Sequence, residues 1–181
     1  MPRRILLLTT GGTIASLPTE EGLAPGLAGA ELAGLLPRGI TDAYDLTIQD
    51  ILHLDSSNIQ PEEWQTIARH VFDNRREYDG IVITHGTDTM AYTASVLSFM
   101  LRGIAIPVVL TGAQLPMTHP LSDGLENLRT ALAMAASGVA GVFLAFDRKV
   151  ILGCRAVKTR TTDFDAFESV NWPLAGMVDG K

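Results

Sequence analysis

Cysteine and long apolar runs are scarce in this sequence of 181 residues. Its single cysteine, Cys154, excludes a disulfide bond within the chain and suits a reducing compartment such as the cytosol. No apolar run is long enough to cross a membrane, and the run at 5–8 is too short for the core of a signal peptide. We therefore expect a cytoplasmic protein without a membrane partner.

Clusters of basic residues are missing as well, and the formal net charge is −6. Nucleic acids and anionic membranes are bound largely through clustered lysine and arginine, so we expect no nucleic acid partner. The chain length fits one domain, and a hydrophobic content of 46% fits a packed core. The sequence therefore predicts a single domain over residues 1–181.

Familiar phosphate-binding and metal-binding patterns are also absent. The Gly-Gly-Thr turn at 11–13 matches neither the dinucleotide pattern G-x-G-x-x-G nor the P-loop. The histidines lack the spacing of metal ligands; they are His53, His70, His85 and His119. We therefore predict that the chain uses no cofactor and no metal ion.

Strand-like and helix-like patterns alternate along most of the chain. Short apolar runs predict strands at 4–9, 45–54, 80–84, 107–111, 142–146 and 150–153. Helical patterns are found at 30–36, from 61 onward, at 90–102 and at 122–136. Such alternation is typical of parallel βαβ units. The predicted fold class is α/β, with a doubly wound, mostly parallel sheet and helices on both faces.

The helices are expected to differ in how they are buried. The helix from 61 should bury one face, formed by Trp64, Ile67, Ala68, Val71 and Phe72. The helix at 90–102 is apolar nearly all round, so we expect it to be well buried or at a subunit interface. Candidate N-caps are Asp88 or Thr89 for that helix and Ser122 for the helix at 122–136.

Two segments lack periodicity. Residues 16–29 hold five glycines and prolines, which predicts a mobile loop of the kind that often covers a binding site. After Ala156 the pattern fades, and most of the tail is expected to be irregular.

Polar residues and glycines directly follow three of the predicted strands. Thr13 comes after a glycine pair, Thr87 and Asp88 come after Gly86, and a Thr-Gly-Ala-Gln run spans 111–114. Ligands of parallel α/β sheets bind outside the carboxyl ends of the strands. We therefore expect these strand ends to form a site.

The residue types at these strand ends suit nucleophilic catalysis. Attack by a hydroxyl needs a base and a donor that stabilises the developing negative charge. Thr13, Thr87 and Ser56 supply hydroxyls, Asp88 is an acid, and Lys158 is a candidate base. A lysine acts as a base when burial or neighbouring cations lower its pKa.

Each of these residues also has a purely structural interpretation. Thr13 can bond within its own turn, Asp88 can cap a helix, and Lys158 can be a solvated surface lysine. His85 can be an ordinary loop histidine rather than an acid–base group. The residue types alone leave these alternatives open and do not identify a substrate.

Two six-residue motifs resemble the signatures of a known family. Residues 10–15 (Thr-Gly-Gly-Thr-Ile-Ala) and 85–90 (His-Gly-Thr-Asp-Thr-Met) are similar to the paired motifs of the bacterial-type L-asparaginases, the asparaginase/glutaminase family. Supporting stretches are 55–57, 111–114, 122–128 and 157–159, and residues 91–101 most resemble the cytoplasmic type I branch. The resemblance covers essentially the whole chain and implies a flavodoxin/Rossmann-like N-terminal domain.

The resemblance implies hydrolysis of L-asparagine to L-aspartate and ammonia through a threonine acyl-enzyme intermediate. Thr13 matches the family's nucleophile, while Thr87 matches a second threonine that acts with Lys158 as base and Asp88 as the group that orients it. The implied substrate-binding residues are Ser56, Ser57, Thr87, Asp88 and Ala113. Among these, Ser56 matches the serine that binds the α-carboxylate, and Ser57 stands where many relatives carry glutamine. Asp88 also matches the residue that holds the α-amino group, and Ala113 one whose carbonyl contacts the amide.

Two departures from the family pattern bear on activity. Leu23 stands about where relatives carry a tyrosine close to the nucleophile, and leucine has no group that relays a proton. Relatives are also nearly twice as long, with a C-terminal domain that supplies a glutamate to a neighbouring subunit. We therefore expect a single catalytic α/β domain, either a natural short form or an isolated N-terminal domain, with weakened substrate affinity.

Family membership further implies a homo-oligomer, a dimer or tetramer, that acts on a small-molecule substrate. That substrate is L-asparagine or L-glutamine, which differ by one methylene worth about 1–3 kcal/mol in a pocket. Two alternatives remain. One is a substrate-binding module with lost turnover, which Leu23 favours. The other is the amide-cleaving subunit of a tRNA-dependent amidotransferase, which the acidic balance and short length disfavour.

Overall fold

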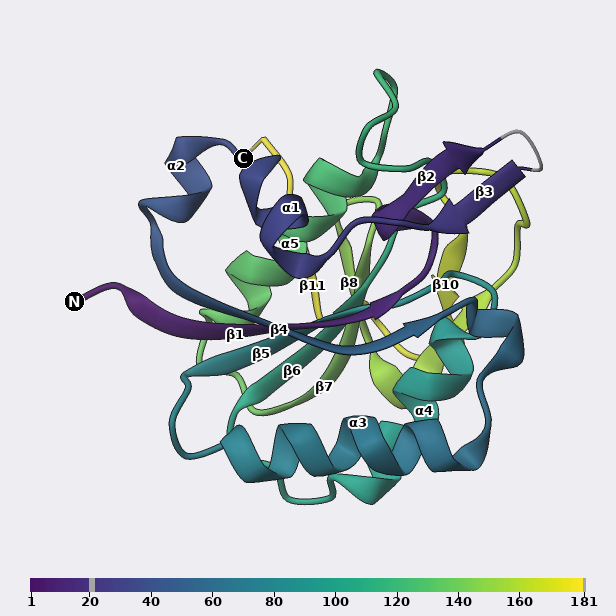
Figure 1. Ribbon diagram of the computed structural model, residues 1–181. Coiled ribbons are helices and arrows are strands. Elements are labelled where there is room, and N and C mark those ends of the chain that lie inside the picture. The colour runs from purple at the N-terminus through teal and green to yellow at the C-terminus, as the bar shows by residue number, and fades with distance from the viewer. Residues whose placement is uncertain (20–21, 181) are drawn as a thin grey trace.

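A seven-stranded sheet forms the centre of the molecule. The structure is a computed structural model that describes residues 1–19 and 22–180, and the side chains of 18–19 and 22–25 are not described. The strand order is β11-β8-β7-β6-β5-β1-β4 (Figure 1). The parallel strands are β1 (Arg3–Gly11), β4 (Tyr44–Leu54), β5 (Gly80–Thr84), β6 (Pro107–Thr111) and β7 (Gly141–Phe146). Antiparallel pairing extends this sheet with β8 (Lys149–Leu152) and β11 (Gly176–Met177).

Helices cover both faces of the sheet, as Figure 1 shows. Helices α3 (Pro61–Asn74) and α4 (Met90–Met100) pack on one face. The other face carries α1 (Gly29–Gly34), α2 (Arg38–Thr41) and α5 (Gly124–Ala135). The expected α/β class, with a doubly wound and mostly parallel sheet, is confirmed.

The central strands form because their residues are apolar on both sides of the backbone. Every residue of β5 and of β6 is buried, which explains why their sequences are continuous apolar runs rather than alternating patterns. The two core clusters lie on opposite faces of this sheet, one beneath α3 and α4 and the other beneath α1, α2 and α5.

Two segments differ from the sequence prediction. Residues 16–29, expected to be a loop, contain a hairpin of β2 (Ser16–Thr19) and β3 (Gly22–Pro25), with residues 20–21 outside the description. The tail after Ala156, expected to be irregular, contains β9 (Ala156–Lys158) paired with β10 (Phe167–Ser169). Strands this short carry too few residues to show a period in the sequence.

The predicted helix faces and caps also need correction. Phe72, placed on the buried face of α3, is 53% exposed, whereas Ile67 and Val71 are buried. The N-cap of α4 is Thr89, whose hydroxyl bonds the Ser56 carbonyl instead of its own helix, so Asp88 is not the cap. Helix α5 begins at Gly124 with Asp123 as N-cap, so the assignment of Ser122 as cap was wrong.

Helix α4 is not buried all round. Met90, Ala94 and Leu97 are buried, but Tyr92 and Phe99 are 67% and 73% exposed.

Within the described residues, no helix combines the length and apolar character needed to cross a membrane.

Candidate active site

The loops after β1 and β5 meet at the carboxyl edge of the sheet with almost no space between them. A Cβ on Gly12 would lie 2.5 Å from the Gly86 nitrogen, and a Cβ on Gly86 would lie 2.5 Å from the Ser56 hydroxyl oxygen. Gly12 also has a φ of 81°, which side-chain-bearing residues rarely adopt. Glycine at both positions therefore lets the loops carrying Thr13, Ser56 and Thr87 converge.

Lys158, Thr87 and Asp88 form a connected polar cluster at this edge. The Lys158 ammonium donates to Thr87 Oγ1 at 2.9 Å and to Asp88 Oδ1 at 2.8 Å. The lysine side chain is only 14% exposed, whereas that of Asp88 is 63% exposed. Lys158 is therefore not a solvated surface lysine, and Asp88 holds it in place from the solvent side.

Thr13 and Ser56 face the same space as Thr87 and Asp88 of this cluster. Thr13 begins the short helix η1 (Thr13–Ala15), and Ser56 begins η2 (Ser56–Asn58). Both line a cavity of about 130 Å³ together with Thr87 and Asp88. The hydroxyls of Thr13 and Ser56 make no hydrogen bond to any described residue, which leaves both available to a ligand.

A second, wider cavity opens on the lysine side of the two threonines. It measures about 420 Å³ and is lined by Lys158, Gln114 and Phe164 as well as by Thr13, Thr87 and Asp88. The two threonines and the aspartate therefore line both cavities. A bound amide could contact them from one side while its leaving group or a water molecule occupies the other.

Two of the expected substrate-binding residues are placed differently. The Ser57 side chain is exposed and bonds Asp55 Oδ1 at 2.9 Å, and Ser57 does not line the 130 Å³ cavity. Ala113 is 1% exposed and belongs to a small apolar cluster with Ile14 and Ala15, so the expected contact of its carbonyl with the amide stays a prediction. The structure therefore places Thr13, Thr87 and Asp88 between two cavities, of which Ser56 lines the smaller and Lys158 the larger. Ser57 and Ala113 line neither cavity.

Gln114 belongs to this site, although the sequence indicated it only as the last residue of the run at 111–114, with no role of its own. Its Oε1 accepts from Thr87 Oγ1 at 3.2 Å, and its Nε2 donates to the carbonyls of Thr161 and Asp163 at 3.1 and 2.8 Å. Gln114 thereby links the second threonine to the segment that follows Lys158. Its position directly after a predicted strand end was the available signal.

Leu23 stands in the family's tyrosine position, but its side chain lies outside the described part of the structure. The backbone of Leu23 pairs with Pro18 in the β2–β3 hairpin. The loss of a proton-relaying group next to Thr13 therefore stays a prediction.

His85 is a buried part of the site's framework rather than a solvated loop histidine. It is 1% exposed, and its two ring nitrogens lie 2.8 Å from the Gly86 carbonyl oxygen and 2.9 Å from Thr93 Oγ1. Burial lowers the pKa of His85 from 6.5 to about 4, although its bond to Gly86 acts in the opposite direction. The ring is therefore neutral at physiological pH.

This lowered pKa predicts a loss of stability in mild acid. Between pH 6.5 and about 4 the unfolded chain binds a proton at His85 that the folded chain does not, so the free energy of unfolding falls as the pH falls. The loss approaches about 3 kcal/mol at the lower end of this window. Urea unfolding from pH 7.5 to 4.0 should show a shallower pH dependence for His85→Asn than for the wild type. Equal slopes would contradict the prediction.

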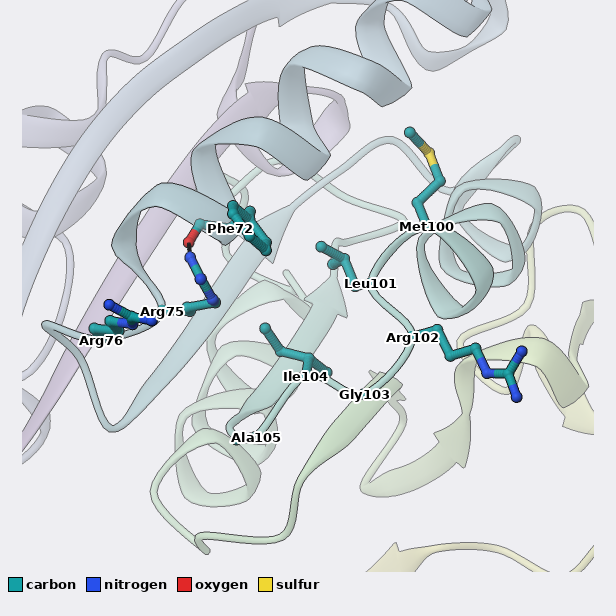
Figure 2. A pocket seen from close by; sticks show the side chains of 9 residues that line it. All are labelled: Phe72, Arg75, Arg76, Met100, Leu101, Arg102, Gly103, Ile104 and Ala105. Atoms are coloured by element: carbon teal, nitrogen blue, oxygen red, sulfur yellow. Dashed lines mark hydrogen bonds between the residues drawn. The ribbon is translucent and has the colours of Figure 1, made fainter.

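A separate cavity of about 240 Å³ lies between the C-terminal ends of α3 and α4 (Figure 2). The Arg75 guanidinium lies 3.4 Å from the Phe72 ring centroid and donates to the Phe72 carbonyl, and Arg102 points away from the cavity. None of its lining residues belongs to the threonine site. Arginines at two helix C-termini are explained by the negative end of the helix dipole.

Comparison with known protein families decides the classification of this chain. The family model described as "Asparaginase, N-terminal" matches residues 4–181, which is nearly the whole chain. The chain belongs to the asparaginase family. The resemblance noted from the two six-residue motifs is confirmed.

Curated members of the family extend well beyond this chain. It is 50% identical over 177 residues to an L-asparaginase of Thermococcus kodakarensis, covering 98% of this chain and 54% of that protein. It is 42% identical to L-asparaginase 1 of Escherichia coli, and the match covers 94% of this chain and 52% of that protein. A glutamyl-tRNA(Gln) amidotransferase subunit of Thermoplasma acidophilum is 36% identical, with coverage of 99% and 46%. The chain therefore spans about half the length of these asparaginase-family proteins.

Solved asparaginase structures share the fold. The thermostable L-asparaginase of Thermococcus kodakarensis has a TM-score of 0.90 at 51% identity, covering 98% of this chain and 54% of that one. L-asparaginase I of Vibrio cholerae has the same TM-score at 36% identity, with coverage of 100% and 55%. A structure titled as a probable cytoplasmic L-asparaginase of Campylobacter jejuni has a TM-score of 0.87 at 36% identity, with coverage of 99% and 55%.

Proposed function

We propose that this chain is the catalytic domain of an L-asparaginase, which hydrolyses L-asparagine to L-aspartate and ammonia. The observation that carries the proposal is the bond from the largely shielded Lys158 to Thr87, in a cavity that Thr13 also lines. A paired lysine and threonine beside a free hydroxyl is the arrangement that a proton-assisted attack on an amide requires. The names of the asparaginase relatives agree with this chemistry.

The proposed reaction has two steps. The Thr13 hydroxyl oxygen bonds to the side-chain amide carbon, its proton passes through the Thr87–Lys158 pair to the leaving nitrogen, and ammonia departs. Water then attacks the resulting threonine ester, aspartate leaves, and a proton returns to Thr13. Backbone N–H groups of Thr13 and Thr87 donate to no described residue, so both are free to stabilise the oxyanion.

The substrate's charged ends find partners in the smaller cavity. The unpaired Ser56 hydroxyl suits the α-carboxylate, and the exposed Asp88 carboxylate suits the α-amino group. Ser57 and the Ala113 carbonyl would contribute from the margin of the site. The reaction as proposed uses no cofactor. Within the described residues, no group of three or more His, Cys, Asp or Glu side chains is arranged to hold a metal ion.

Ammonia release from L-asparagine, with L-glutamine in parallel, tests this function directly. We expect turnover of at least one amide, with L-aspartate or L-glutamate as the second product. Binding of L-aspartate by calorimetry without ammonia release would replace the proposal with a substrate-binding module.

The amidotransferase relative provides a second candidate of the same chemistry. The 36% identity over 187 residues favours a shared amide-cleaving step, but a net charge of −6 disfavours binding of tRNA. Ammonia production that depends on added tRNA would support this alternative.

We infer that the domain works in the cytosol as a homo-oligomer, a dimer or tetramer. A single cysteine suits a reducing compartment, and the exposed Tyr92 and Phe99 give α4 an apolar surface that a second copy would cover. We expect light scattering to give at least twice the monomer mass of 19.4 kDa. Replacing Phe99 with glutamate should weaken this assembly, and a monomeric wild type would contradict it.

A further inference from the structure

The hydrogen bonds around His85 can run in only one direction. The Gly86 carbonyl only accepts, so the ring nitrogen Nδ1, 2.8 Å away, must carry the proton. In a neutral ring Nε2 is then an acceptor, and the Thr93 hydroxyl donates to it at 2.9 Å. The indole N–H of Trp64 only donates, and it supplies Thr93 Oγ1 at 2.8 Å. A series of hydrogen bonds with one direction of donation therefore runs from Trp64 through Thr93 and His85 to the Gly86 carbonyl.

The last of these hydrogen bonds, from His85 to the Gly86 carbonyl, sets the orientation of the peptide that leads into Thr87. In a trans peptide the C=O and N–H groups point to opposite sides. Because the Gly86 carbonyl is drawn toward the His85 ring, the Thr87 N–H points away from that ring. Gly86 and Thr87 both line the 130 Å³ cavity, and the Thr87 N–H donates to no described residue.

The His85–Gly86 peptide, which precedes this one, is tightly enclosed. A Cβ on Gly12 would lie 2.5 Å from the Gly86 nitrogen, and a Cβ on Gly112 would lie 2.3 Å from the His85 carbonyl oxygen. The loops after β1 and β6 thus hold the segment from two sides. These contacts fix the His85–Gly86 peptide, so the orientation of the following Gly86–Thr87 peptide depends on the bond that its carbonyl accepts from His85.

We propose that His85 is a positioning residue that turns the Gly86–Thr87 peptide so that its N–H faces the substrate, and that Thr93 and Trp64 lock the ring in this role. The inference rests on the proposed amidohydrolase function and adds three residues to it. None of the three touches the substrate. They act through the Thr87 N–H, which donates to the negative oxygen that develops in the transition state.

Two matched substitutions distinguish the role of His85 Nδ1 from that of Nε2. His85→Asn retains an amide N–H near the position of Nδ1, whereas His85→Gln places its amide near Nε2 and removes the donor to Gly86. We expect His85→Gln to lower kcat roughly 100-fold with KM nearly unchanged, because one oxyanion donor is misdirected. His85→Asn should stay within about tenfold of the wild-type kcat. Equal losses in both variants, or no loss in either, would overturn the proposal.

Thr93 supplies the second test. Thr93→Val removes the hydroxyl at constant shape and should lower kcat, whereas Thr93→Ser should restore it. The matched control is Thr130→Val, which removes another buried helix hydroxyl, one that bonds only the Glu126 carbonyl within α5. Both valine variants should lose similar thermal stability, but only Thr93→Val should lose kcat. Equal kcat values in these two variants would overturn the role of Thr93.

A spectroscopic measurement separates this inference from the proposed function. Nitrogen-15 NMR of the wild type should show His85 protonated at Nδ1 and not at Nε2, whether or not ammonia is released. The Thr87 amide resonance should move in His85→Gln much further than in His85→Asn. A ring protonated at Nε2 would overturn the inference even in an active enzyme, whereas an inactive wild type with the expected tautomer would contradict only the proposed function.

Discussion

Replacing Lys158 with methionine is expected to lower kcat for ammonia release by about 10³-fold. Methionine has a similar length but accepts and donates no proton, so Thr87 would lose its partner at 2.9 Å. The Asp88 carboxylate would stay solvated, because its side chain is 63% exposed, and the fold should tolerate the change. Affinity for L-aspartate, measured by calorimetry, should fall only a few-fold.

The matched control for this experiment is Lys149→Met. Lys149 is paired with Asp165 and Asp147 outside the site and is similarly shielded, with 26% of its side chain exposed. This variant should keep a kcat close to that of the wild type. A kcat in Lys158→Met that equals the value in Lys149→Met would refute proton transfer through Lys158.

Thr13→Val should have an even larger effect, lowering kcat by at least about 10⁴-fold, because it removes the proposed nucleophile at constant shape. The Thr13 hydroxyl makes no hydrogen bond to a described residue, so its loss should change stability little. Thr13→Ser should recover part of the activity because it restores a hydroxyl at the same position. Rapid-mixing kinetics would show no acyl-enzyme burst in Thr13→Val.

The competing assignment makes Thr87 the nucleophile, since Lys158 bonds that residue directly. A burst that survives in Thr13→Val and disappears in Thr87→Val would establish this alternative. Thr66→Val is the control for both, because the Thr66 hydroxyl bonds only the Glu62 carbonyl within α3. It should leave both the burst and the steady-state rate unchanged.

The sequence predicted the parts of the fold that depend on local pattern. Strands β5 and β6 were expected at 80–84 and 107–111 and lie there, because buried strands bounded by glycine or proline have a strong signal. Strands β9 and β10, three residues each, were not expected. Their formation depends on a partner found elsewhere in the chain, which no local period records.

The site divides in the same way. Thr13, Ser56, Thr87 and Asp88 could be proposed from sequence because each follows a predicted strand end. Lys158 was named as a candidate base, but only the fold shows that it is shielded and paired. The role proposed for His85 was beyond sequence reasoning, because it depends on Thr93 in α4 and on Trp64 in α3, which donates to Thr93.

The small sheet that carries Lys158 has a consequence for the heat and denaturant resistance of the activity. Strand β9 pairs with β10 and not with the central sheet, whereas the loops that carry Thr13 and Thr87 directly follow the central strands β1 and β5. Segments held by few pairings open locally at a lower free energy than the core does. The segment that carries Lys158 should therefore open at a lower free energy than the segments that carry Thr13 and Thr87. Enzyme activity should fade at denaturant concentrations where the main sheet is still intact, and backbone amides of β9 should exchange with solvent before those of β5.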